Sequence, residues 1–119
     1  MVLSINTIER NKIELGLFDN KSHRCFEFET ERQSEDLLVA IDGILKNHQL
    51  KLKNLKAILV NRGPGSFTGT RVGVTVANTL GWILDIPVVG YRNGELEETP
   101  MRKINQSKFS KPVIPYYIK

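Results

Sequence analysis

The sequence is poor in the side chains that cross-link chains or hold metal ions. Its 119 residues include one cysteine, Cys25, and two histidines, His23 and His48. A single cysteine excludes a disulfide within the chain. Without a CxxC pair or a cysteine–histidine cluster, we expect no structural zinc site. His23 and His48 lack the spacing of metal ligands, and we interpret both as ordinary surface or edge residues. We therefore predict no metal site.

Long apolar runs are also missing. No stretch approaches the roughly 20 apolar residues that cross a bilayer. The first residues, Met1–Asn6, lack the basic start and long apolar run of a secretion signal. A composition of 40% apolar and 25% charged residues is typical of a globular protein. We expect one domain in the cytoplasm, without membrane contact.

The net charge is +4, and the basic residues gather in two clusters. The first cluster holds Lys46, Lys51, Lys53 and Lys56, and the second holds Arg102, Lys103, Lys108 and Lys111. Each cluster is either a solvated lysine surface or a contact to phosphate, and the first reading is favoured. Neither cluster interleaves aromatic residues as a single-strand binding platform does.

Hydrophobic patterning predicts an α/β fold. Strands are expected at 2–5, 13–18, 25–30, 57–60 and 88–91, and helices at 34–48 and 70–84. The order βββαβαβ predicts a mixed five-stranded sheet with helices packed on it, the outline of a ribonuclease H-like (actin-like) half-domain. We divide the chain into this lobe, residues 1–91, and a polar linker with an extended tail, residues 92–119. Two prolines confine the apolar stretch 112–118 to an edge or a packed extended tail.

Both helices carry a distinct face. In the first helix we expect Ser34 to cap the N-terminus. Its apolar stripe, favoured as core over interface, comprises Leu37, Leu38, Ile41, Ile44 and Leu45. In the second helix a face with almost no side chain comprises Gly69, Gly73, Ala77 and Gly81. This small-residue face packs either against a partner helix or against the chain's own sheet or first helix.

A glycine-rich loop precedes the second helix, and it differs from the standard phosphate-binding and nucleophile loops. A P-loop or a dinucleotide fingerprint would need glycine where Thr68 stands. A nucleophile elbow around Ser66 would need glycine where Pro64 stands. The sequence shows no evident base for Ser66, so we predict no catalytic residue here.

The same loop carries a specific resemblance. Gly63-Pro64-Gly65-Ser66-Phe67-Thr68-Gly69, continued by Thr70-Arg71-Val72-Gly73, closely resembles the GPGSFTGLR-[VI]-G signature of the TsaB (YeaZ) family. The flanking runs 58–60 and 86–90 also sit as the family has them, and a weaker resemblance extends over residues 1–91. The ending Pro115-Tyr116-Tyr117-Ile118-Lys119 is similar to the Pro-x-Tyr-[Leu/Ile]-[Arg/Lys] ending of family members.

The resemblance implies a function through partners. TsaB proteins are actin-like, usually have two lobes, and have no catalysis of their own. They pair with the metal-dependent transferase TsaD, and with the ATPase TsaE they support formation of threonylcarbamoyladenosine at position 37 of tRNAs reading A-starting codons. For this chain the resemblance implies a non-catalytic accessory subunit without cofactor. Its expected partners are a TsaD-like transferase or a second copy, a TsaE-like ATPase through the complex, and tRNA indirectly.

The resemblance also suggests site residues. TsaB proteins meet their partner through helices of the first lobe, so Gly69, Gly73, Ala77 and Gly81 become a candidate partner interface. Thr68 is a candidate cap of the second helix, with Arg71 close to its first turn. Phe67 is either a partner contact or a plug in the chain's own core.

Three departures from the family keep other functions open. Asn6-Thr7-Ile8 stands where the family has Asp-Thr-Ser, and Gln33-Ser34 where it has His-Ser. The second lobe is essentially missing. The alternatives are a self-associating scaffold that uses the same helix and a residual nucleotide-binding or hydrolytic activity at the glycine loop. Asn6 and the missing lobe argue against the enzymatic alternative.

Overall fold

The computed structural model describes residues 1–19 and 21–93. Its strands are β1 (Val2–Asn6), β2 (Lys12–Phe18), β3 (His23–Glu29), β4 (Ala57–Asn61) and β5 (Val88–Tyr91). Its helices are α1 (Gln33–Asn47), the short 3-10 helix η1 (Leu52–Asn54) and α2 (Phe67–Leu84). The predicted βββαβαβ order is confirmed. The predicted tail, the second basic cluster and most of the predicted linker lie outside the described residues.

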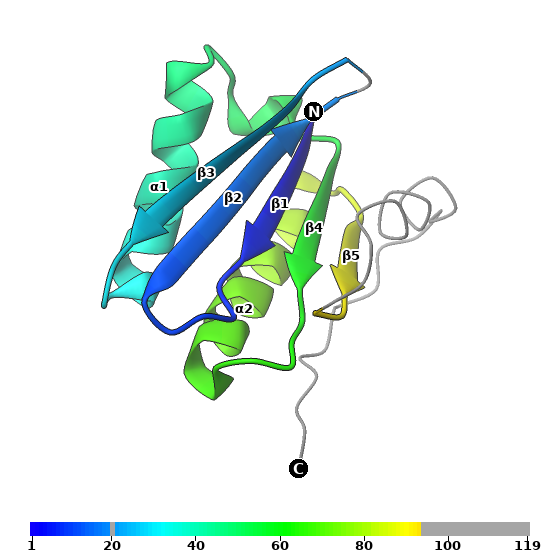
Figure 1. The fold of residues 1–119 in the computed structure, drawn as a ribbon. Coiled ribbons are helices and arrows are strands. Elements are labelled where there is room, and N and C mark those ends of the chain that lie inside the picture. Colours follow the sequence, from blue (N-terminus) through cyan, green and yellow to red (C-terminus); the bar gives the residue numbers. More distant parts are fainter. Residues whose placement is uncertain (20, 94–119) are drawn as a thin grey trace.

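The described strands form one mixed sheet with the order β3-β2-β1-β4-β5. The pairs β1–β2 and β2–β3 are antiparallel, and β1–β4 and β4–β5 are parallel. Within the described residues, α1 and α2 both lie on one face of this sheet (Figure 1). The carboxyl ends of β1 and β4 meet at the same edge, where the glycine-rich loop begins.

The core lies between this sheet and the two helices. The parallel register places Leu3 beside Ile58 and Ile5 beside Val60, and all four side chains are fully buried. Every position of β4 is buried, as expected for a central strand that is apolar on both faces.

Helix α1 begins one residue before the predicted position, so the predicted cap is wrong. Ser34 lies inside the first turn, and Arg32 occupies the cap position without a side-chain hydrogen bond. The turn is closed by Thr30, whose hydroxyl accepts the Arg32 N–H at 2.9 Å and donates to Asp36 at 2.6 Å. The predicted apolar stripe is buried except for Leu38, which is exposed.

Helix α2 is confirmed, although its sequence contains several glycines and β-branched residues. Its cap is Ser66, whose hydroxyl accepts the Gly69 N–H at 3.2 Å. Thr68 lies within the first turn, so the prediction of a Thr68 cap is wrong. Asp85 ends the helix in the left-handed conformation, with φ of 55°. In the described parts of the chain, neither helix is long and apolar enough to cross a membrane.

The small-residue face of α2 packs against the chain's own sheet, which corrects the predicted partner interface. Gly69, Gly73, Ala77 and Gly81 are all buried in the single chain. A side chain on Gly69 or Gly73 would collide with Thr7, and one on Gly81 would collide with Val88. The close approach of helix to sheet explains the four-residue spacing of small residues. The alternative that the sequence left open, packing on the chain's own sheet, is the observed one.

The two helices offer a matched pair of glycine substitutions. Gly81→Ala should lower the free energy of unfolding by about 1–3 kcal/mol, because its Cβ overlaps Val88. Gly43→Ala, in α1, should raise it by about 0.5–1 kcal/mol, because a Cβ there meets nothing within 4 Å and alanine favours the helix. Urea unfolding of the full chain measures both. Equal effects of the two substitutions would contradict the packing described here.

Candidate functional site

The glycine-rich loop joins three parts of the fold. Its Ser66 N–H donates to the Ile8 carbonyl at 2.7 Å, and its Gly63 N–H donates to the Asn61 side chain at 3.0 Å. The Gly63 carbonyl accepts the Asn93 N–H at 2.8 Å. The loop therefore ties the β1–β2 connection to the ends of β4 and β5.

Two glycines of the loop are required by its geometry. Gly63 has φ of 94°, a conformation that L side chains rarely adopt. A Cβ on Gly65 would lie 2.6 Å from the Ile8 Cβ and 2.9 Å from the Ile8 carbonyl oxygen. The amides of Gly63, Ser66 and Gly69 already donate within the protein. This use of the signature is structural, because an anion-binding loop would aim such N–H groups at its ligand.

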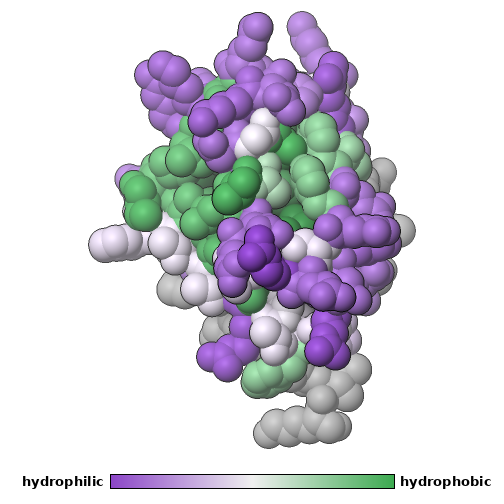
Figure 2. Space-filling view, turned by 90° about the vertical axis from the view of Figure 1, so that its left-hand side faces the viewer, coloured by the Kyte–Doolittle hydropathy of each residue, from purple (hydrophilic) through white to green (hydrophobic). Residues whose placement is uncertain are grey.

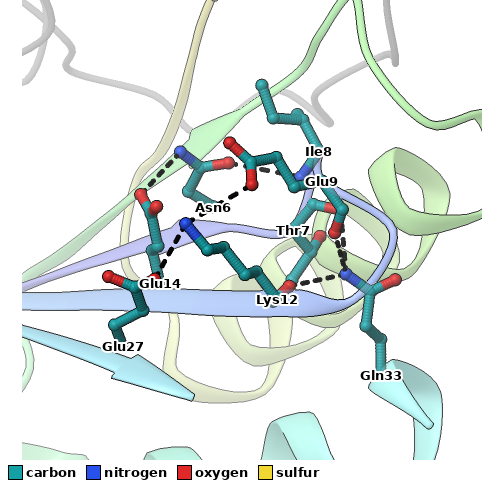
Figure 3. A network of polar contacts seen from close by, with 8 residues as sticks. All are labelled: Asn6, Thr7, Ile8, Glu9, Lys12, Glu14, Glu27 and Gln33. Carbon is teal, nitrogen blue, oxygen red and sulfur yellow. Dashed lines mark hydrogen bonds and ion pairs between the residues drawn. The ribbon is translucent and has the colours of Figure 1, made fainter. Parts of the chain in front are cut away.

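Thr7 and Gln33 hold the β1–β2 connection against the two helices. The buried Thr7 hydroxyl donates to the Gly69 carbonyl at 2.6 Å, across 62 residues of sequence. The Gln33 amide donates to three carbonyls, those of Glu9 and Lys12 at 2.6 Å and that of Thr7 at 3.2 Å (Figure 3). Sequence reasoning recorded both residues only within departures from the family pattern, Thr7 in Asn6-Thr7-Ile8 and Gln33 in place of a histidine. The sequence signal that could have identified them was their position, because Thr7 directly follows β1 and Gln33 begins α1.

Asn6, which stands where the family has a carboxylate, is used locally. Its amide oxygen accepts the Ile8 N–H and its amide nitrogen donates to Glu14, both at 3.2 Å (Figure 3). Nearby, Lys12 lies 2.8 Å from Glu27 and 3.5 Å from Glu9. The hydrogen bond that the Lys12 amine donates to Glu27, together with the charges of both acids, raises the pKa of Lys12. The amine therefore stays protonated and belongs to an ion-pair network.

Among the described residues, no group of three or more histidines, cysteines or acids could hold a metal ion. His23 is exposed on β3. His48, next to the end of α1, interacts with Arg24 at 3.0 Å and with the Ile44 carbonyl at 2.8 Å. These contacts link β3 to α1 and serve the fold.

The outward part of the signature consists of Gly65, Phe67, Thr68 and Arg71, which are exposed. The Arg71 guanidinium lies 5.5 Å from the centre of the Phe67 ring, within the range of a cation–π contact. Phe67 is thus a surface residue, and the alternative of a plug in the core is wrong.

Several large apolar side chains are exposed on the two helices. The most exposed are Trp82 at 85%, Val39 at 70%, Ile83 at 64%, Phe67 at 59% and Leu38 at 53%. We call this set the α1–α2 face. Figure 2, which looks onto the side that carries α1, shows apolar side chains across the upper part of this side, with hydrophilic ones above and below them. Contiguous exposed apolar area is typical of surfaces that bind other proteins.

Two buried threonines test the role of the Thr7 hydroxyl. Thr7→Val should lower the free energy of unfolding by about 1 kcal/mol or more, because the donor to the Gly69 carbonyl is lost. Thr70→Val should leave stability unchanged or raise it, because the Thr70 hydroxyl has no hydrogen-bond partner in the described structure. Chemical denaturation compares the two variants. A larger loss for Thr70→Val would overturn the assignment.

The chain matches known proteins over most of its described part. A family model described as TsaD, tRNA N6-adenosine threonylcarbamoyltransferase, matches residues 27–116. The tRNA threonylcarbamoyladenosine biosynthesis protein TsaB of Bacillus subtilis is 47% identical over 49 residues, which is 41% of this chain and 21% of that protein. The TsaB of Haemophilus influenzae is 40% identical over 77 residues, or 65% of this chain and 33% of that protein. The matches therefore span a third or less of these relatives.

Solved structures agree with the sequence matches. A Pseudomonas aeruginosa protein described as similar to peptidase YEAZ superposes with a TM-score of 0.71 at 25% identity, covering 76% of this chain and 42% of that one. The RuvC of T. thermophilus superposes with a TM-score of 0.52 at 13% identity, covering 92% and 81%, which supports the ribonuclease H-like fold alone. The chain belongs to the family that the threonylcarbamoyltransferase model describes, and within it to the TsaB (YeaZ) proteins.

Proposed function

We propose that the chain is a non-catalytic accessory subunit in the formation of N6-threonylcarbamoyladenosine at position 37 of tRNAs reading A-starting codons. In this proposal it pairs with a TsaD-like transferase through the α1–α2 face, acts with a TsaE-like ATPase through the complex, and meets tRNA indirectly. The observation that carries the proposal is an exposed apolar helix face on a member of the TsaB family. The expected cytoplasmic location stays a prediction.

The α1–α2 face has the features of a binding surface. Trp82 is 85% exposed, and tryptophans dominate the energy of many protein interfaces when a partner covers them. Ile83 follows it directly, and Phe67 with Arg71 stands at the other end of the same helix. A partner that covers α2 would therefore bury apolar side chains at both ends of the helix, with an arginine at the rim.

The non-catalytic part of the proposal is supported by how the loop uses its polar groups. Asn6 supplies an amide where the family pattern has a carboxylate, and both ends of that amide are engaged by Ile8 and Glu14. Three loop amides donate to protein acceptors. Nucleotide hydrolysis at this loop would require a rearrangement of these contacts.

Self-association is the alternative that the same observation favours. An apolar helix face can meet a second copy of itself in a symmetric dimer. The proposal of a heterodimer and this alternative differ in whether a TsaD-like partner replaces the second copy.

The first experiment measures mass by light scattering for the full chain alone and mixed with the TsaD-like transferase of the same organism. We expect a one-to-one complex. Trp82→Glu should weaken pairing at least about tenfold, because it places a charge in the apolar contact. Leu52→Glu, at an exposed apolar residue of η1 outside both long helices, should leave pairing unchanged.

Other results of this experiment have defined meanings. Monomers that persist in the mixture would contradict pairing with the transferase. A dimer of the chain alone that the transferase does not displace would favour self-association. Equal weakening by Trp82→Glu and Leu52→Glu would place the contact elsewhere on the surface.

A further inference from the structure

Strand β4 buries side chains on the sheet face that points away from the helices. Alternation along the strand places Ile58 and Val60 in the core beneath the helices. Ala57, Leu59 and Asn61 therefore point to the opposite face, yet they are only 1%, 3% and 2% exposed. Burial this deep requires a cover on the second face.

The neighbouring strands cannot supply that cover. Leu59 is flanked by Ser4 of β1 and by Val89 of β5. Strands about 4.8 Å apart shield a side chain from the sides, but they leave its end open to solvent. Within the described residues, α1 and α2 both lie on the other face (Figure 1).

The two halves of the second face differ in charge. Toward β4 and β5 it carries Ala57, Leu59 and Val89. Toward β2 and β3 it carries charged side chains, including Lys12 paired with Glu27 at 2.8 Å. Charged side chains can remain exposed to water, whereas the apolar ones are stabilised by burial. We therefore expect the cover over β4 and β5.

We propose that residues 112–118 of this chain cover the apolar half of the second face. The described chain leaves the fold beside this half: the Arg62 N–H donates to the Tyr91 carbonyl at 2.9 Å, and the Asn93 N–H donates to the Gly63 carbonyl at 2.8 Å. Residues 94–111 can extend to about 60 Å, so residue 112 can reach any point of the sheet.

The chemistry of the segment fits this face. Its sequence, Pro-Val-Ile-Pro-Tyr-Tyr-Ile, has no charge, and its side chains are apolar or aromatic. Proline lacks the backbone N–H of a central strand, so the two prolines exclude a new interior strand of the ladder. An extended segment laid across β4 and β5 would bury its aliphatic side chains on Leu59 and Val89. The inference is independent of the proposed function.

Contacts between methyl groups in solution test the proposal directly. In the full chain with labelled methyl groups, Leu59 and Val89 should show nuclear Overhauser contacts to Val113, Ile114 or Ile118. Samples mixed from labelled and unlabelled chains distinguish contacts within one molecule from contacts between two molecules. We expect these contacts within one molecule. Contacts that arise only between two chains would assign the face to a second copy and overturn the proposal. Absence of any contact to residues 112–118 would also overturn it.

A stability measurement in the full chain provides a second test. Ile114→Asp should lower the thermal midpoint by about 5–10 °C, because a charge would replace apolar contact on the sheet. Leu96→Asp makes the same change within the polar linker and should leave the midpoint within about 2 °C. Equal shifts for both variants, or none for Ile114→Asp, would contradict the proposed cover.

Discussion

The close approach of α2 to the end of β1 is the constraint on which the rest of the structure depends. Gly69 and Gly73 bring the helix backbone against Thr7, and the Thr7 hydroxyl donates to the Gly69 carbonyl. Larger side chains at these positions would push the helix off the sheet. The same contact places the glycine-rich loop over Ile8, where its backbone amides are used within the fold.

This constraint also decides which surface is free for a partner. Because the small residues of α2 face the sheet, its bulky residues Phe67, Trp82 and Ile83 face outward. A helix face with small side chains is often taken as a site of close helix–helix contact. Here that closeness serves the helix–sheet contact, and the opposite side carries the exposed apolar side chains of the proposed partner surface.

Much of the fold could be predicted from the sequence, because the spacing of apolar residues and the presence of turn-forming residues are local signals. The order of the elements along the chain, the interior position of β4 and the start of the glycine loop all followed from them. The two predicted helix caps, in contrast, are wrong. Ser34 and Thr68 each lie two residues after the observed cap position, which Arg32 occupies in α1 without a side-chain hydrogen bond. Ser66 supplies the cap of α2 because the loop contact to Ile8 fixes its position.

The sequence by itself determined the secondary-structure elements, their order and the family, since each rests on residue types at fixed spacing. Only the tertiary structure decided which face of α2 is inside. A stripe of small residues at helical spacing indicates that another element packs closely on this side of the helix. The spacing is the same whether that element is the chain's own sheet or the helix of a partner. The positions of Thr7 and Val88 in space, set by long-range strand pairing, resolve that ambiguity.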